Sequence, residues 1–202
     1  MPYISRPDAE GIVRPYFGDF ITVVRAAWAD WMIGAYAHQM QHKRVRANCV
    51  WNQLLAHAKR QFDGRPGICV DTMKDWDGVL VAGRVFIRMK KGTYALLSRN
   101  YPTQAALAFH DTTQDLFGGI ARLELLYILD DSETDVERIV LVQRHKAAVV
   151  WSIDLLESGD ASDVQVVMPL LPPQPTGAPA DRMIRPKQTQ EDDAKREPKT
   201  GS

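Results

Sequence analysis

Cysteine is scarce in this chain: only Cys49 and Cys69 occur among 202 residues. Both stand inside apolar segments, and two isolated thiols cannot supply the disulfide framework of a small secreted domain. The five histidines are scattered, and none stands at metal-ligand spacing from a cysteine. We therefore expect two buried thiols that act as small hydrophobic side chains, a cytoplasmic location, and no metal site or cofactor.

Long hydrophobic runs are also missing. No window approaches the ~18 uninterrupted apolar residues that a membrane span needs. The start MPYISRPDAEG lacks the apolar core of a secretory signal. The patterns GxxxxGK(S/T), GxGxxG, GxSxG and HExxH do not occur. These absences remove a membrane partner and several common enzyme classes from the expected functions.

Net charge is the third thing the chain lacks, since 25 basic and 25 acidic residues cancel. The cancellation hides a segregation along the sequence. Residues 1–101 carry 15 Lys and Arg against 8 Asp and Glu, whereas residues 102–171 carry 4 against 12. A basic half gives a neutral protein a local reason to bind polyanions, so a binding surface is expected there.

Two helices are expected in the N-terminal part. In residues 17–39, apolar side chains recur every three or four positions, and this stripe contains Trp28 and Trp31. We expect both tryptophans to fill the core. A second helix is expected over residues 43–62, because Gly64 and Pro66 follow it as stop signals.

Beyond residue 66 the hydrophobic period changes to two, which is typical of strands. A short helix is expected at residues 102–110. The expected strands are Gly67–Val70, Asp77–Val81, Gly83–Lys91, Ala121–Leu129, Val136–Val142 and Ala148–Leu155, with Val164–Leu171 as a further edge-strand candidate. Short links between consecutive strands imply hairpins. The predicted class is therefore α+β: two N-terminal helices, a mostly antiparallel sheet with a short inserted helix, and a C-terminal tail.

Composition divides the chain into two parts. Residues 1–171 are interpreted as one α+β domain of ordinary size. Residues 172–202 hold six prolines and eleven charged residues with almost no apolar side chains. This composition is typical of a disordered tail, because such a segment cannot bury enough apolar surface to fold.

The segment Arg84–Lys90 gives the most informative strand, because its alternation is regular. One face is apolar and is expected to meet the core: Val85, Ile87 and Met89. The other face carries cations around one aromatic ring, with a lysine added at the end: Arg84, Phe86, Arg88, Lys90 and Lys91. Sheets use such rows to hold phosphates and stack a base. The alternative is a face that is solvated or covered by the acidic half of the same chain.

The second expected helix begins with three further cations, Lys43, Arg44 and Arg46. Positive charge at a helix start is unfavourable against the helix dipole, and a docked anion would offset that cost. The candidate residues for binding nucleic acid or another anion are thus Lys43, Arg44, Arg46, Arg84, Phe86, Arg88, Lys90 and Lys91.

An acidic hairpin offers the main competing interpretation. Its carboxylates are Asp130, Asp131, Glu133, Asp135 and Glu137. They could pair internally with the basic strand, stand free in water as a solvated turn, or direct a partner to another surface.

One enzyme interpretation stays open. Residues 43–129 run helix–strand–strand–strand–helix–strand, which is the core order of restriction-endonuclease-like nucleases. Such enzymes hold Mg²⁺ with an Asp on the second strand and a carboxylate two residues before a Lys on the third. Here Asp77 opens the second strand, but Arg88 stands two residues before Lys90. A cation repels the metal, so a degenerate relative that still binds nucleic acid is favoured over an active nuclease.

Three segments carry a resemblance: GRVFIRMKKG, NYPTQAALAF and VVWSIDL. They resemble a poorly characterised group of bacterial proteins encoded beside helix-turn-helix regulators, in loci of toxin–antitoxin or mobile-element type. The resemblance covers residues 43–155. It implies a genetic setting and a protein partner from a neighbouring gene, and it carries no assigned active site.

The sequence therefore predicts a cytoplasmic bacterial binding protein, of toxin–antitoxin or phage-defence type, that engages nucleic acid or an acidic partner through its basic strand. Two alternatives stay open. One is the degenerate Mg²⁺-dependent nuclease, and the other is a module that binds only protein, through the tryptophan-rich first helix or the acidic hairpin. Catalysis is less favoured, because no set of nucleophile, base and orienting group is recognisable.

Overall fold

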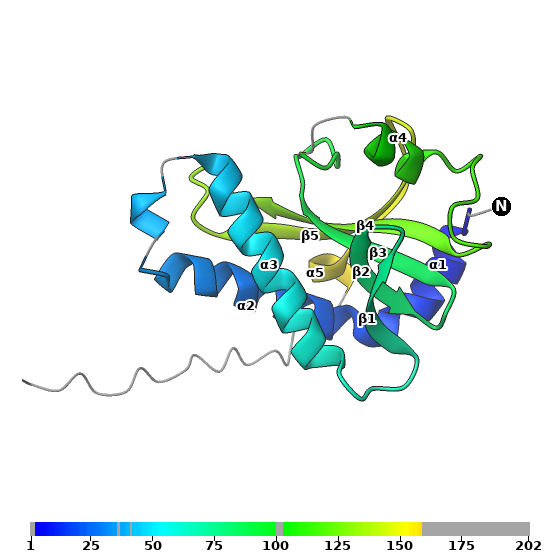
Figure 1. The fold of residues 1–202 in the computed structure, drawn as a ribbon, viewed down its shortest axis with the longest axis horizontal. Coiled ribbons are helices and arrows are strands. Elements are labelled where there is room, and N and C mark those ends of the chain that lie inside the picture. The colour runs from blue at the N-terminus through cyan, green and yellow to red at the C-terminus, as the bar shows by residue number, and fades with distance from the viewer. Residues whose placement is uncertain (1–2, 36, 41, 100–102, 159–202) are drawn as a thin grey trace, which may run out of the picture. The chain divides into compact units, whose positions relative to one another are not determined.

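The computed structural model describes residues 3–35, 37–40, 42–99 and 103–158 (Figure 1). Within them, N-terminal helices precede a six-stranded sheet with one short inserted helix, so the predicted α+β class is confirmed. The expected strand Val164–Leu171, the tail from residue 172 and the predicted domain end at residue 171 lie outside the described residues. In the described part of the chain, no helix is both long and apolar enough to cross a membrane.

The N-terminal part holds α-helices and short 3₁₀ helices in alternation. Their bounds are α1 Arg6–Val13, η1 Arg14–Tyr16, α2 Phe17–Ile33, η2 Ala37–Gln39 and α3 Lys43–Phe62. Both predicted helices are present, but the first ends at Ile33 and not at residue 39. The reason is Gly34, which leaves the helical region with a ψ of 128° and so ends α2.

Helix α1 is absent from the sequence-based prediction. Its start uses ordinary capping chemistry, since the Ser5 hydroxyl accepts a hydrogen bond from the Asp8 amide at 3.2 Å and Pro7 lies in the first turn. Only Ala9 and Val13 are buried on this eight-residue helix. Two buried positions are too few to produce a detectable helical period, so only the capping residues signal α1 in the sequence.

The sheet follows the chain order β1-β2-β3-β4-β5-β6. The strand bounds are β1 Ile68–Met73, β2 Trp76–Val81, β3 Val85–Lys91, β4 Ala121–Leu129, β5 Val136–His145 and β6 Ala148–Asp154, and β6 leads into α5, Leu155–Ser158. β1 extends beyond its predicted end at Val70. The turn before β2 is tighter than expected, because Lys74 and Asp75 take positive φ angles of 45° and 67°.

β3 and β4 are parallel, whereas the other neighbouring pairs in the described sheet are antiparallel. Parallel neighbours need a crossover connection, and this one contains α4, Gln104–His110. The Thr103 hydroxyl caps α4 by accepting a hydrogen bond from the Ala106 amide at 3.1 Å. The order from α3 to β4 is thus the helix–strand–strand–strand–helix–strand order expected from the sequence.

One face of the sheet packs against α2 and α3 and forms the main core. Val85, Ile87 and Met89 lie in this core, as their alternation predicted. Trp28 of α2 is also buried there, and its indole nitrogen donates a hydrogen bond to the Thr134 carbonyl at 2.9 Å. Trp31 is only half-buried against the same core. The prediction that the tryptophans fill the core is therefore confirmed fully for Trp28 and in part for Trp31.

The prediction that both cysteines are buried is wrong. Cys49 is half-buried and Cys69 is exposed, because Cys69 follows the buried Ile68 in β1 and its side chain points to the other face.

The opposite face of the sheet is covered by the crossover between β3 and β4, and α4 and α2 lie on opposite sides of the sheet (Figure 1). Phe86 is fully buried there against Phe109 and Phe117. Further along the same face, Leu96 packs against a second apolar cluster that contains Leu126. The sheet is therefore a middle layer, and neither face of β3 is open along its whole length.

Gly78 on β2 provides a test of how closely β2 and β3 approach. A β-carbon at this position would lie 2.6 Å from the Ile87 carbonyl oxygen and 2.7 Å from the Phe86 ring. We expect Gly78→Ala to lower the free energy of unfolding by about 1–3 kcal/mol, because the strands must move apart. Urea unfolding measures this difference.

The matched control is Gly11→Ala in α1, where a β-carbon meets nothing within 4 Å. Alanine within a helix should raise the free energy of unfolding by about 0.5–1 kcal/mol relative to glycine. Equal stability of the Gly78 variant and the wild type would show that β2 and β3 are packed less closely than the structure indicates.

Candidate functional site

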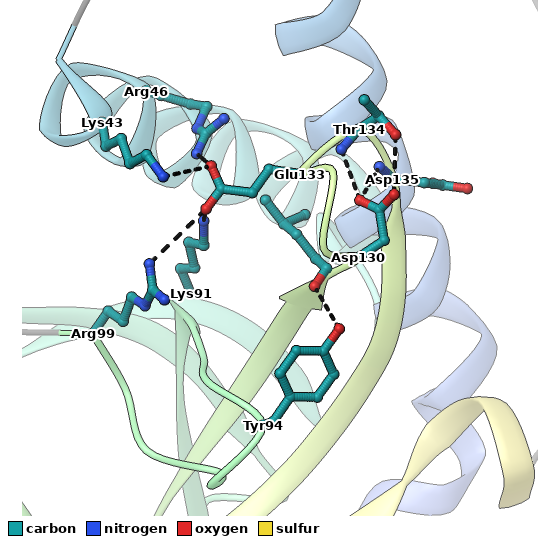
Figure 2. A network of polar contacts seen from close by, with 10 residues as sticks. Lys43, Arg46, Lys91, Tyr94, Arg99, Asp130, Glu133, Thr134 and Asp135 are labelled. Carbon is teal, nitrogen blue, oxygen red and sulfur yellow. Dashed lines mark hydrogen bonds and ion pairs between the residues drawn. The ribbon is translucent and has the colours of Figure 1, made fainter.

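Four cations from separate parts of the chain converge on one carboxylate, that of Glu133 (Figure 2). Arg46 forms both an ion pair and a hydrogen bond with it. The other distances to its carboxylate oxygens are 3.0 Å from Lys91 Nζ, 3.3 Å from Lys43 Nζ and 3.9 Å from Arg99 Nη1. Lys43, Arg46, Lys91 and Arg99 are called the cation cluster from here on.

Three segments of the fold supply the cation cluster. The first turn of α3 carries Lys43 and Arg46, β3 ends at Lys91, and Arg99 lies in the crossover. The Arg99 amide donates a hydrogen bond to the Lys91 carbonyl at 3.0 Å, which brings the crossover back beside the end of β3. The cluster therefore depends on tertiary structure and not on one run of basic residues.

The hairpin between β4 and β5 holds Glu133 in place through Asp130 (Figure 2). Asp130 Oδ1 accepts hydrogen bonds from the amides of Thr134 at 2.7 Å and Asp135 at 3.0 Å, and Oδ2 accepts from Ser132 and Thr134 hydroxyls. These bonds, led by that of the Asp135 amide, lower the pKa of Asp130 to about 2. Glu133 itself takes a positive φ of 54° in this turn. A firmly bonded turn thus presents the carboxylate to α3.

The cation cluster keeps Glu133 ionised. The hydrogen bond from Arg46 is the main cause that lowers the pKa of Glu133 to about 2, and Lys91 contributes as well. Burial lowers the pKa of Lys91, although its hydrogen bond with Glu133 opposes that shift. Because one carboxylate faces four cations, most of the positive charge of the cluster has no counter-charge from Glu133.

A cavity of about 260 Å³ adjoins the cation cluster. Its lining residues are Ala47, Asn48, Trp51, Leu54, Met89, Lys90, Lys91, Arg99 and Tyr127. The Lys90 ammonium lies 5.5 Å from the centre of the half-buried Trp51 ring, which is cation–π distance. Burial, helped by the charge of Arg88, lowers the pKa of Lys90 to about 8. The cavity thus combines an aromatic ring with amine and guanidinium groups.

The structure separates the eight predicted binding residues. Four of them lie in the cation cluster or on the cavity beside it: Lys43, Arg46 and Lys91 in the cluster, and Lys90 on the cavity. Arg44 is exposed in the first turn of α3. Arg84 is exposed at the other end of β3.

Phe86 and Arg88 are buried beneath the crossover. Arg88 lies 4.6 Å from the centre of the Phe109 ring and pairs in register with Glu124 of the acidic half. The alternative that the acidic half covers this face is therefore correct at these two positions. A continuous basic strand face is not available to a ligand, because its central part is enclosed.

Sequence reasoning missed Arg99 and the aromatic member of the cavity, Trp51. Arg99 follows a segment without a regular period, so no sequence pattern places it beside Lys91. Trp51 belongs to a helix that was predicted correctly, but its position opposite Lys90 depends on how α3 packs on the sheet. The acidic hairpin did contain a usable signal, since internal pairing with the basic strand was one of its predicted roles and Glu133 pairs with Lys91.

The residues at the nuclease positions do not suit a metal ion. Asp77 lies in β2 and accepts a hydrogen bond from the Thr72 hydroxyl at 2.6 Å. Arg88 fills the position of the second carboxylate and is buried beneath α4. Among the described residues, no group of three or more His, Cys, Asp or Glu side chains could hold a metal. The strand order of such nucleases is present here without their ligand set.

Comparisons with known proteins returned no match among protein-family models, curated proteins or solved structures. Function must therefore be inferred from the residues themselves.

Glu133→Gln tests how strongly the carboxylate binds the cation cluster. We expect the free energy of unfolding to fall by about 1–2 kcal/mol near neutral pH, because charge-assisted hydrogen bonds are lost and water screens the remainder. The folded pKa of about 2 lies below the ordinary 4.5, so the contribution is present above pH 4.5 and is lost as pH falls toward 2. Urea unfolding across this pH range measures both effects.

Asp131→Asn is the control, because it removes an exposed carboxylate from the same hairpin. It should change stability little and should keep the pH dependence of the wild type. Equal stability of the Glu133 variant and the wild type at neutral pH would contradict a tight bond between the hairpin and the cation cluster.

Proposed function

We propose that the chain binds single-stranded nucleic acid at the cation cluster and the adjoining cavity. The observation that carries this proposal is the convergence of four cations from three segments on a point that holds one carboxylate. Lysine and arginine groups in such an arrangement neutralise backbone phosphates, and the release of counterions then drives binding.

The cavity favours a single strand over a duplex. Its volume of about 260 Å³ is slightly below that of most ligand pockets, so it accepts no more than one base or phosphate group. Trp51 offers a ring for stacking, and stacking on aromatic side chains requires a base that is free of its partner strand. A duplex would meet the cations with its phosphates but would leave the cavity unused.

A cytoplasmic bacterial setting of toxin–antitoxin or phage-defence type belongs to this proposal through the resemblance described above, together with a protein partner from a neighbouring gene. Nucleic-acid binding is favoured over an interaction with protein alone, because the cations gather beside a cavity with an aromatic wall. The acidic hairpin is already engaged through Glu133, which leaves it less available as a docking surface.

Fluorescence anisotropy with labelled single-stranded DNA, single-stranded RNA and duplex DNA tests the proposal over a range of salt concentrations. We expect the single strands to bind more tightly, with affinity falling as salt rises by a slope of about −0.7 per phosphate contact. Arg99→Glu should weaken binding about tenfold or more. Its side chain is 56% exposed, so the fold should tolerate the change.

The matched control is Arg84→Glu, which makes the same charge change at an exposed position at the far end of β3. It should leave binding nearly unchanged. An equal loss in both variants would show diffuse attraction to the basic half of the chain, and the absence of salt-sensitive binding by the wild type would refute the proposal. Mg²⁺-dependent cleavage that is lost in Asp77→Ala would instead support the nuclease alternative.

A further inference from the structure

A second group of cations is buried beneath α4, on the sheet face opposite the main core. It consists of three arginines with one glutamate and one histidine: Arg88 on β3, Arg122 and Glu124 on β4, Arg144 on β5, and His110 at the end of α4. We call these residues the buried arginine cluster. Arg88 is 7% exposed and Glu124 is 1% exposed, so the group is nearly removed from water.

The charges of the buried arginine cluster do not balance. Two guanidinium groups, those of Arg88 and Arg144, act on the Glu124 carboxylate, and Arg144 Nη1 lies 3.4 Å from one of its oxygens. Arg122 is attracted instead by Asp111 and Asp115. Burial and the charge of Arg144 lower the pKa of His110 to about 3, so its imidazole is neutral at ordinary pH. Burial raises the pKa of Glu124, while Arg144 and Arg88 oppose that shift. The cluster therefore carries an excess of positive charge in an enclosed space.

Two of the arginines have partners of their own. Arg122 donates hydrogen bonds to the carbonyls of Ala108, Asp111 and Gln114 at 3.1, 2.7 and 2.8 Å, and so fixes the end of α4. Arg144 donates to the Ser98 hydroxyl at 3.2 Å and to the Lys146 carbonyl at 3.1 Å. These bonds explain why the crossover lies on the sheet, but the Nε atom of Arg144 stays buried without an acceptor.

Arg88 differs from the other two arginines, because its buried atom without a partner is a terminal nitrogen, whereas in Arg122 and Arg144 it is Nε. The Nη1 atom of Arg88 is buried without a hydrogen-bond partner. Glu124 Oε1 is likewise buried without a hydrogen bond, and the neutral His110 lies beside it with Nε2 at 3.5 Å. The Arg88 guanidinium contacts aromatic rings instead, at 4.6 Å from the centre of Phe109 and 5.8 Å from that of Trp76. Burying a charged donor without an acceptor is costly, and such a group in a folded protein indicates a partner such as water or an ion.

We propose that Arg88 and Arg144 bind inorganic phosphate beneath α4. An oxyanion supplies acceptors for the unsatisfied guanidinium donors and offsets the excess positive charge. Phosphate at neutral pH also carries a proton that it donates to Glu124 Oε1, whereas sulfate has no proton to donate. Phosphate is therefore preferred over sulfate at this site.

The limited access to the cluster selects a small anion. The side chains of Arg144 and His110 are 11% and 8% exposed, so the cluster meets solvent only at its edge. We expect adenosine monophosphate to bind more weakly than inorganic phosphate, because so little of the cluster is exposed. The site is separate from the cation cluster, and it rests on the unsatisfied Arg88 and not on the proposed nucleic-acid binding.

Calorimetric titration of the full chain with inorganic phosphate, and separately with sulfate and adenosine monophosphate at matched ionic strength, tests the inference. We expect the wild type to bind phosphate more tightly than sulfate. Arg88→Met keeps the length of the side chain but removes the donors, and we expect it to weaken phosphate binding about tenfold or more. Arg144→Met should act in the same direction, and it decides the matter if the Arg88 variant fails to fold.

Two control variants separate the sites. Arg84→Met removes an exposed cation from the turn before β3, and Arg99→Met removes one from the cation cluster. Both variants should bind phosphate as the wild type does. The inference is overturned if the wild type binds no phosphate, if Arg88→Met and Arg144→Met keep wild-type affinity, or if Arg99→Met alone loses it. In that last case phosphate binds at the cation cluster. Binding of single strands should be unchanged in Arg88→Met, so the two proposals fail independently.

Discussion

The parallel pairing of β3 with β4 decides where the charged side chains of this protein lie. Parallel neighbours cannot be joined by a hairpin, so the chain crosses the face of the sheet before β4 begins. The crossover covers Arg88 with α4 and, before that, returns Arg99 to the side of Lys91. A basic strand that alternates regularly in sequence thus becomes a strand whose middle is enclosed and whose end is open.

The two groups of cations differ in how they are compensated. Around Glu133, the ends of four long basic side chains meet a carboxylate from the β4–β5 hairpin, and the side chains of Lys43 and Arg99 are exposed. Beneath α4, guanidinium groups meet aromatic rings, backbone carbonyls and one carboxylate, with little water. This difference in exposure is why we propose a long polyanion for the first group and a small ion for the second.

The sequence predicted what depends on local pattern. Alternation assigned Val85, Ile87 and Met89 to the core, and helical periodicity located α2 and α3. The sequence could not show whether Arg88 is exposed to water. Its burial depends on α4, and no sequence pattern indicated which part of the sheet the apolar side chains of α4 cover. The sequence also could not predict that Arg99 lies beside Lys91. This contact follows from the path of the crossover and not from the residue types involved.

The bond between Arg46 and Glu133 joins residues 87 positions apart in the chain. A contact between residues so far apart in the sequence forms only after much of the domain has folded. Closing a long loop costs entropy, and the contacts that offset this cost form later. During synthesis the basic half leaves the ribosome first, while the carboxylate that neutralises part of it is not yet made. The N-terminal half therefore emerges with its excess of basic residues uncompensated, and Arg46 gains its carboxylate only after the β4–β5 hairpin has been made.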